Sequence, residues 1–220
     1  MLNMPDHCNL NRDALHASNR IIPSHSGKCK RMTSIEDLLA RHSTPSKVLG
    51  EPGPDDAQLL RMLAVAVHVP DHGRLSPWRF IRIRGDAREA LGRVLEARLV
   101  EREPDAPPAR RDKERNRFNH APCVIAVIAH LTPGHKIPES EQIQSGSCAC
   151  FSLLQAAQAL GFGAQWLTGM AAYDEGVLAA LGLTSNERVL GFIHIGTARA
   201  PGEERPRADP ATLLTDWNPA

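Results

Sequence analysis

Polar side chains that could bind a ligand gather where a predicted helix gives way to a strand. His68 and His72 stand four residues apart in the segment VHVPDHGRLSPWRF. Two histidines need further ligands to hold a metal ion, and the sequence has no HExxH motif or facial carboxylate pattern to supply them. We therefore interpret the pair as hydrogen-bonding groups in a ligand loop and predict no metal site. An ordinary helix-to-strand turn is the alternative.

Arg41, His42 and Ser43 form a second polar group, at the end of a short helix that begins after Ser34. An arginine and a hydroxyl two residues apart can bind a phosphate, because the guanidinium donates paired hydrogen bonds and the serine a neutral one. The alternative is an arginine that only complements the negative end of the helix dipole. The local sequence leaves both interpretations open.

The elements that must position these groups are helices and strands in irregular alternation. Hydrophobic spacing predicts helices over 34–43, 55–69, 86–103, 109–117, 138–160 and 174–182. Alternating or continuous apolar runs predict strands over 78–84, 123–129 and 188–196, and a short strand or turn over 163–169. A last element is expected at 212–217, and His68 should lie in the last turn of its helix. Without a GxGxxG, P-loop or GxSxG motif, we expect an α+β fold with a small mixed or antiparallel sheet flanked by helices.

The long helix over 138–160 carries small residues on nearly every face, in the run SGSCACFSLLQAAQAL. A helix that is apolar or small all round must be enclosed. We therefore expect it to be buried at a subunit interface, with Cys148 and Cys150 as small buried thiols. Trp166, shortly after this helix, is expected to be exposed enough to contact a ligand.

The composition indicates a globular chain without a nucleic-acid or membrane ligand. Of the 220 residues, 42% are hydrophobic and 23% are charged, and the formal net charge is +1. This near-neutral charge argues against nucleic acid, and no apolar run approaches the ~20 residues of a membrane helix. The basic run over 109–117 is interleaved with acidic residues, so we interpret it as a solvated face.

Cysteine usage and the N-terminal segment suggest the compartment and the domain boundary. The five cysteines are odd in number and lack CxxC spacing, which indicates neither a disulfide framework nor a zinc site. A reducing, cytoplasmic location is therefore expected. Residues 1–31 show no helical or strand periodicity, so we expect a disordered or loosely packed extension before a single domain over 32–220.

Five short motifs, in order along the chain, resemble those of the nitroreductase family of FMN-dependent oxidoreductases, and of its compact bacterial branch in particular. They are Arg41-His42-Ser43, the block Val69-Pro70-Asp71-His72 with Pro77-Trp78-Arg79-Phe80, Gly161-Phe162-Gly163, Trp166-Leu167-Thr168-Gly169, and Gly191-Phe192 with Gly196-Thr197. Each motif alone is weak, but five in register are specific. The resemblance runs from about residue 32 to the C-terminus, and residues 1–31 have no counterpart.

The resemblance implies a fold, a cofactor and a reaction. The fold would be α+β and nitroreductase-like, in an intertwined homodimer with FMN at the subunit interface. Hydride would pass from NAD(P)H through FMN to a nitroaromatic, a quinone or a similar acceptor by a ping-pong mechanism. Because a flavin carries this chemistry itself, no catalytic side chain is expected. A flavin-binding or redox-sensing protein with negligible turnover is the alternative.

The resemblance also implies the residues of the site. Eight positions match the family's flavin contacts: Arg41, His42 and Ser43 at the phosphate and ribityl chain, His68 and His72 in the helix-end loop, and Trp166, Leu167 and Thr168 beside the ring. His42 and His68 stand where the compact branch has arginine, which removes permanent positive charge. Arg199 or Arg207 could replace that charge.

Overall fold

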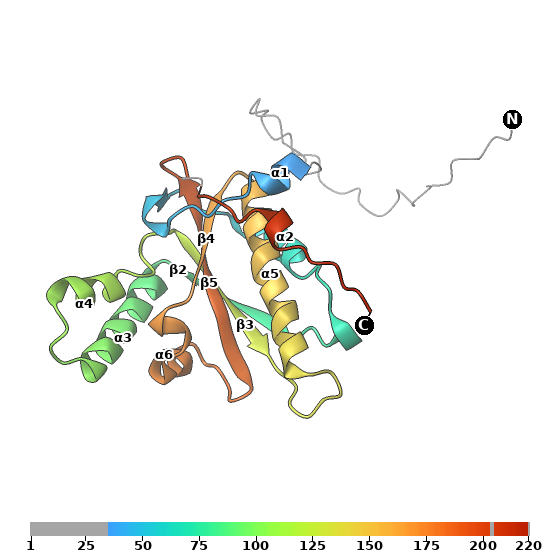
Figure 1. Ribbon diagram of the computed structural model, residues 1–220. Coiled ribbons are helices and arrows are strands. Elements are labelled where there is room, and N and C mark those ends of the chain that lie inside the picture. The colour runs from blue at the N-terminus through green and yellow to red at the C-terminus, as the bar shows by residue number, and fades with distance from the viewer. Residues whose placement is uncertain (1–34, 203–204, 220) are drawn as a thin grey trace, which may run out of the picture.

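An antiparallel sheet of five strands lies between two groups of helices in the computed structural model, which describes residues 35–202 and 205–219 (Figure 1). The strands are β1 (Leu49–Gly50), β2 (Trp78–Arg84), β3 (Cys123–His130), β4 (Gly163–Leu167) and β5 (Glu187–Ala198). Strand β5 pairs with β1, β3 and β4, and β2 pairs with β3. The strand nearest the C-terminus is therefore the one that joins the others into a sheet. The N-terminal extension expected over 1–31 lies outside the described residues.

The burial of each strand follows its sequence pattern. The continuous apolar run of β3 is buried over its whole length except for the terminal His130. In β2, at the edge of the sheet, Ile83 is buried while Arg82 and Arg84 are exposed. Strands covered on both faces need apolar residues throughout, whereas an edge strand with one wet face alternates. The three strands predicted from periodicity are confirmed, with β5 longer than expected, and the segment left as a strand or turn forms the short strand β4.

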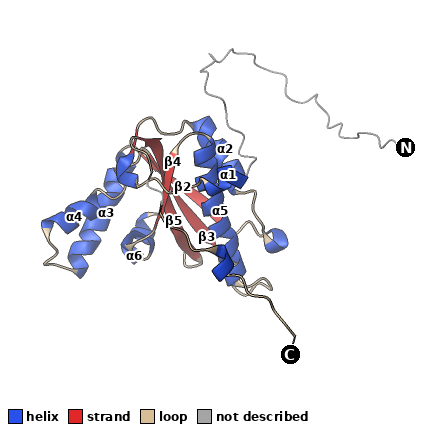
Figure 2. Ribbon diagram, turned by 45° about the horizontal axis from the view of Figure 1, so that its top comes forward, coloured by secondary structure: helices blue, strands red, loops and turns tan. Residues whose placement is uncertain are grey.

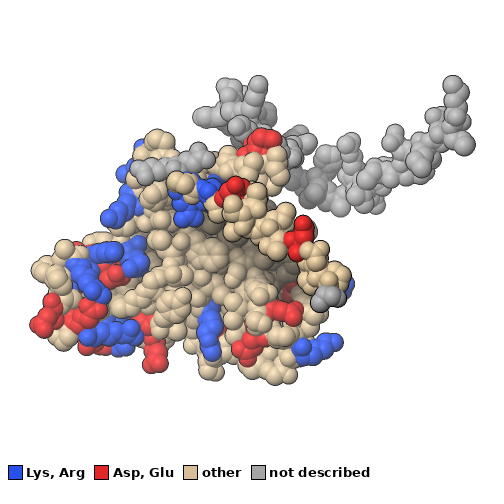
Figure 3. Space-filling view, viewed as in Figure 1, with Lys and Arg blue, Asp and Glu red and all other residues tan. Residues whose placement is uncertain are grey.

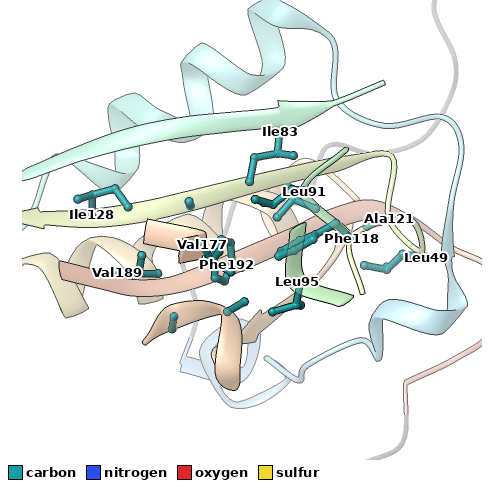
Figure 4. Packing of buried hydrophobic residues seen from close by; sticks show 14 residues of the cluster. Leu49, Ile83, Leu91, Leu95, Phe118, Ala121, Ile128, Val177, Val189 and Phe192 are labelled. Atoms are coloured by element: carbon teal, nitrogen blue, oxygen red, sulfur yellow. The ribbon is translucent and has the colours of Figure 1, made fainter. Parts of the chain in front are cut away.

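Two layers of helices cover the two faces of the sheet (Figures 1 and 2). Helices α2 (Asp56–Ala66) and α5 (Glu139–Ala159) lie on one face, and α3 (Asp86–Arg102) and α6 (Glu175–Ala180) lie on the other, with α4 (Pro108–Arg115) packed against α3. Figure 4 shows the apolar cluster on the α3 face, where side chains of α3, β3 and β5 turn toward one another. The rings of Phe118 and Phe192 meet edge to face there, with centroids 5.1 Å apart. The predicted α+β architecture is thus confirmed, with an entirely antiparallel sheet.

Several predicted boundaries are wrong by a few residues, and the reasons are local. Helix α1 spans only Ile35–Leu39 and buries no residue, so no packed face stabilises further turns. Helix α2 ends at Ala66, which leaves His68 beyond its last turn. The expected element at 212–217 is instead a single 3-10 turn, Pro210–Thr212, followed by irregular chain.

The two cysteines of α5 lie on different faces of the helix. Cys150 is buried, and burial raises the pKa of its thiol to about 12. Cys148 is exposed in the single chain, so the core of one chain does not bury it. Phe151, three residues further along and therefore on the same side, is 44% exposed. Within one chain, α5 thus presents an uncovered apolar face.

The described residues contain neither a helix that could span a membrane nor a cluster of metal-binding side chains. No helix in residues 35–202 and 205–219 is both long and apolar enough to cross a membrane. No group of three or more histidine, cysteine, aspartate or glutamate side chains in the same ranges could hold a metal ion.

Candidate functional site

Three arginines converge beside the C-terminal half of α5. The guanidinium carbon of Arg41 lies 5.9 Å from the centroid of the Phe151 ring. Burial, and then the neighbouring guanidinium groups of Arg207 and Arg205, lower the pKa of Arg41. Arginine keeps its proton even so, and like charges held together in this way repel one another. We call Arg41, Arg205 and Arg207 the arginine cluster, and its charge pattern suits a polyvalent anion.

Arg199, which the sequence analysis considered together with Arg207, lies against β1 instead of beside Arg41. Its backbone N–H donates to the carbonyl of Val48 over 2.9 Å. Its side chain covers Gly50 so closely that a Cβ added to Gly50 would lie 1.9 Å from the Arg199 Nε. Arg207, together with the unpredicted Arg205, therefore supplies the additional charge near Arg41.

His42 and Ser43 follow Arg41 on an exposed turn. The His42 Nδ1 lies 3.1 Å from the carbonyl oxygen of Ala40. Its ring packs against Gly202, where an added Cβ would lie 2.1 Å from the His42 Cδ2. The imidazole also lines a cavity of about 200 Å³ with residues from the end of α5 and the start of β4. His42 is thus held between the C-terminal tail and the sheet.

One backbone and one side-chain hydrogen bond join the segment after Ser43 to β4. The Thr44 N–H donates to the Ala164 carbonyl over 2.9 Å, and the Ser46 N–H donates to the Gln165 Oε1 over 2.6 Å. The short 3-10 helix η1 (Ser46–Val48) and β1 follow at once. Two of the three predicted groups, 41–43 and 166–168, are therefore brought into one region of the molecule.

Trp166 points to the α5 side of the sheet and is half-buried. Its Nε1 donates to the Leu190 carbonyl over 3.0 Å. Gly191 leaves the room that the indole needs, since an added Cβ there would lie 1.9 Å from the Nε1. Trp166 is therefore a packing residue in part, rather than a freely exposed platform. Leu167, next in β4, instead lines a pocket in which α4 and η1 meet.

That pocket is lined by basic side chains that the sequence analysis missed. It has a volume of about 330 Å³, and we call it the basic pocket. Its lining residues are Pro45, Ser46, Lys47, Lys113, Arg117, His120, Gln165 and Leu167. The 109–117 run had been interpreted as a solvated face, which holds for the exposed Arg110. Lys113 and Arg117 are four residues apart and can therefore face the same pocket, and this spacing was the available signal.

The charges of the basic pocket are only partly balanced. Arg117 donates from both Nε and Nη2 to the carboxylate of Glu114, each over 2.6 Å. Lys47 and Lys113 make no ion pair with any residue in the described ranges. The pocket therefore keeps a positive excess beside the end of β4.

In the third predicted group, His72 lies beside the first turn of α5, away from the arginine cluster of the same chain. The His72 Nδ1 is 2.7 Å from the Glu141 Oε2 in the first turn of α5. Glu141 precedes Phe151 by ten residues, which corresponds to about 15 Å along a helix. The loop is shaped by positive φ angles at Gly73, Arg74 and Ser76, of 74°, 56° and 48°. A single chain therefore does not bring His72 to the arginine cluster.

Comparison with known proteins identifies the family. The model of the nitroreductase family matches residues 38–197. The chain belongs to the nitroreductase family. This nitroreductase match covers helices α2 to α6, all but the last residue of the sheet and all eight predicted site residues, and it ends before Arg205 and Arg207.

Relatives and solved structures agree with this assignment. The Escherichia coli (strain K12) protein named "Putative NAD(P)H nitroreductase YdjA" is 35% identical over 166 residues, which are 76% of this chain and 88% of that protein. A nitroreductase-like family protein from Bacillus cereus has the same fold, with a TM-score of 0.72 at 21% identity, over 86% of this chain and 98% of that one. A nitroreductase from Desulfovibrio desulfuricans, solved in complex with FMN, has a TM-score of 0.64 at 21% identity, over 84% and 96%.

Proposed function

We propose that this chain is an FMN-dependent NAD(P)H oxidoreductase that passes hydride to a nitroaromatic, a quinone or a similar acceptor. The observation that carries the proposal is the arginine cluster, in which Arg205 and Arg207 add their charge to Arg41. Such a group of positive charges suits the terminal phosphate of FMN. The names of the relatives, and the FMN held by the Desulfovibrio protein, support the same conclusion.

The path from the cluster to β4 fits the rest of the cofactor. Ser43 is exposed beside Arg41, and its hydroxyl can donate to a phosphate or ribityl oxygen. The basic pocket follows along the same segment, where Lys47 and Lys113 stabilise negative charge near Leu167. When bound, FMN supplies the hydride chemistry. The side chains therefore need only bind, orient and add positive charge.

The proposal includes a homodimer, because one chain leaves large apolar residues uncovered. Three large apolar side chains are exposed: Phe151 of α5 by 44%, Leu39 of α1 by 75% and Trp217 of the C-terminal tail by 84%. Figure 3 shows a hollowed, uncharged area in the middle of this face, with acidic and basic side chains around its edge. Exposed apolar surface of this kind is typical of an interface. A second copy on this face would carry its His68 and His72 loop toward the arginine cluster of the first.

The spectrum of the purified protein and its flavin affinities test the proposal. We expect a yellow protein that oxidises NAD(P)H, and we expect Arg205→Ala with Arg207→Ala to weaken FMN binding by at least about tenfold, as loss of charge-assisted hydrogen bonds does. Riboflavin, which has no phosphate, should lose little affinity in the same variant. Arg188→Ala is the matched control, because Arg188 is exposed and bonds to the Ser185 carbonyl.

Two outcomes would contradict the proposal. A colourless protein that neither binds FMN nor oxidises NAD(P)H would remove it altogether. Reduction of bound FMN by NAD(P)H on a scale of minutes would instead identify a flavin-binding protein with negligible turnover. The cytoplasmic location stays a prediction, in agreement with the free thiols of Cys123, Cys148 and Cys150.

A further inference from the structure

His120 is a titratable residue in the wall of the basic pocket. It is half-buried in the turn between α4 and β3. Lys47 faces it from η1, Lys113 and Arg117 face the same pocket from α4 and the turn after it, and Glu114 is occupied by Arg117. The His120 ring makes no hydrogen bond or ion pair with any residue of the described ranges. Its ring nitrogens are therefore available to solvent and to the contents of the pocket.

A second histidine, His194 of β5, lies behind the pocket. It is fully buried, and among the described residues neither ring nitrogen has a hydrogen-bond partner. Its ring stacks on Phe118 with centroids 6.1 Å apart, and it is paired in register with Gln165, which lines the pocket. Directly paired residues of antiparallel strands point to the same face. On the buried side of the pocket, the described residues therefore place the neutral His194 near His120 and no acidic side chain.

The electrostatics keep both histidines neutral near pH 7. Burial, and then Lys47, lower the pKa of His120. Burial, and then Arg117 and His120, lower the pKa of His194 to about 4. A negative charge placed in the pocket would act on His120 in the opposite direction, because it favours the imidazolium. His194, which is fully buried, stays neutral.

We propose that His120 takes up a proton from solvent when the flavin bound beside the basic pocket is reduced, and releases it when the flavin is reoxidised. This inference rests on the proposed function. The hydride from NAD(P)H brings two electrons and one proton, so the pocket gains one negative charge. A second proton, supplied by solvent, binds a ring nitrogen of His120 and neutralises that charge. When the acceptor takes the hydride, the proton returns to solvent.

The midpoint potential of bound FMN, measured between pH 6 and pH 8, tests this coupling. In the wild-type protein the potential should fall with pH along a two-proton slope in the lower part of the range. In His120→Gln it should follow a one-proton slope, half as steep, throughout. His135→Gln is the control, because His135 lies outside the basic pocket and only accepts a hydrogen bond from Ile137. Equal slopes in wild-type and His120→Gln would overturn the inference.

A second measurement uses the unaltered chain and does not depend on a variant. With ¹³C-labelled histidine, the NMR titration of His120 should move to higher pH when dithionite reduces the bound FMN. An unchanged titration would overturn the inference even if the protein is an active oxidoreductase. Failure to bind FMN at all would instead contradict the proposed function, so the two failures are distinguishable.

Discussion

A buried histidine without a hydrogen-bond partner makes the stability of this chain depend on pH. His194 has an ordinary pKa of 6.5 in the unfolded chain and a pKa of about 4 in the folded one. Below pH 6.5 the unfolded chain binds a proton that the folded chain rejects. The contribution of His194 to stability should therefore fall as the pH drops from 6.5 to 4 and level off below, by up to about 3 kcal/mol.

The substitution His194→Leu tests this at a single position. It removes the titrating ring and keeps an apolar side chain of similar size against Phe118. Urea unfolding at pH 7.5 and pH 5 should show a smaller loss of stability on acidification in the variant than in the wild-type protein. His68→Gln, at an exposed histidine, should keep the wild-type pH dependence. Equal pH dependence in His194→Leu and wild type would contradict this assignment.

Among the single residues of the site, Arg41 and Ser43 could be predicted from the sequence more readily than the C-terminal arginines. Arg41 and Ser43 were predicted as a phosphate-binding pair because they are neighbours on the chain. Arg205 was missed because its electrostatic effect on Arg41 joins the two ends of the described chain through an irregular tail, and no local spacing encodes such a proximity. Arg207 was one of two candidates, and only the tertiary structure separates it from Arg199.

Among the elements, the loop after α2 is held in an unusual shape by one carboxylate. Asp71 accepts hydrogen bonds from the Leu75 and Ser76 N–H groups over 3.1 and 2.8 Å. The Ser145 hydroxyl of α5 donates to the Pro70 carbonyl over 2.5 Å. Arg74 and Ser76 occupy the left-handed region, which costs non-glycine residues about 1 kcal/mol or more each. Asp71 offsets this cost and fixes the loop that presents His72.

We predict that Asp71→Ala lowers the free energy of unfolding by about 1–3 kcal/mol, since it leaves two N–H groups without their acceptor. Hydrogen exchange should accelerate at Leu75 and Ser76 and remain unchanged in β3. Asp71→Asn, which keeps one acceptor oxygen, should lose less. Unaltered exchange at both amides in Asp71→Ala would show that the carboxylate does not hold the loop.

Hydrophobic periodicity predicted where the helices and strands lie more reliably than it predicted which side of each element faces a neighbour. The runs of β2 and β3 identified these strands almost to the residue, because burial on one or both faces leaves a direct trace in the pattern. The run of α4 identified a helix, but its charge alone suggested a solvated face on all sides. Which of its residues face η1 is decided by packing against α3, and that contact has no signature in the α4 sequence.

For the whole molecule, the separation of His72 from the arginine cluster predicts sites shared between subunits. Arg41→Ala and His72→Ala should each weaken FMN binding, and more strongly than Cys148→Ala. In a heterodimer of the two variants, one site contains both substitutions and the other contains neither. Differently tagged, purified heterodimers should therefore bind FMN at wild-type affinity in one site of two.

A site formed within one chain predicts the opposite result. Each half of the heterodimer would then carry one substitution, and neither site would recover wild-type affinity. The occupancy measured by absorbance at a limiting FMN concentration separates the two cases. The two single-variant homodimers, measured at the same concentration, give the baseline.

The position of β5 has a consequence for biosynthesis. Because this strand connects β1, β3 and β4, the nascent chain cannot assemble its sheet until translation has passed about residue 198. Until then the apolar β3 has one edge open to other molecules. A premature stop before Glu187 would make that condition permanent, and such a product should be insoluble although it contains most of the helices.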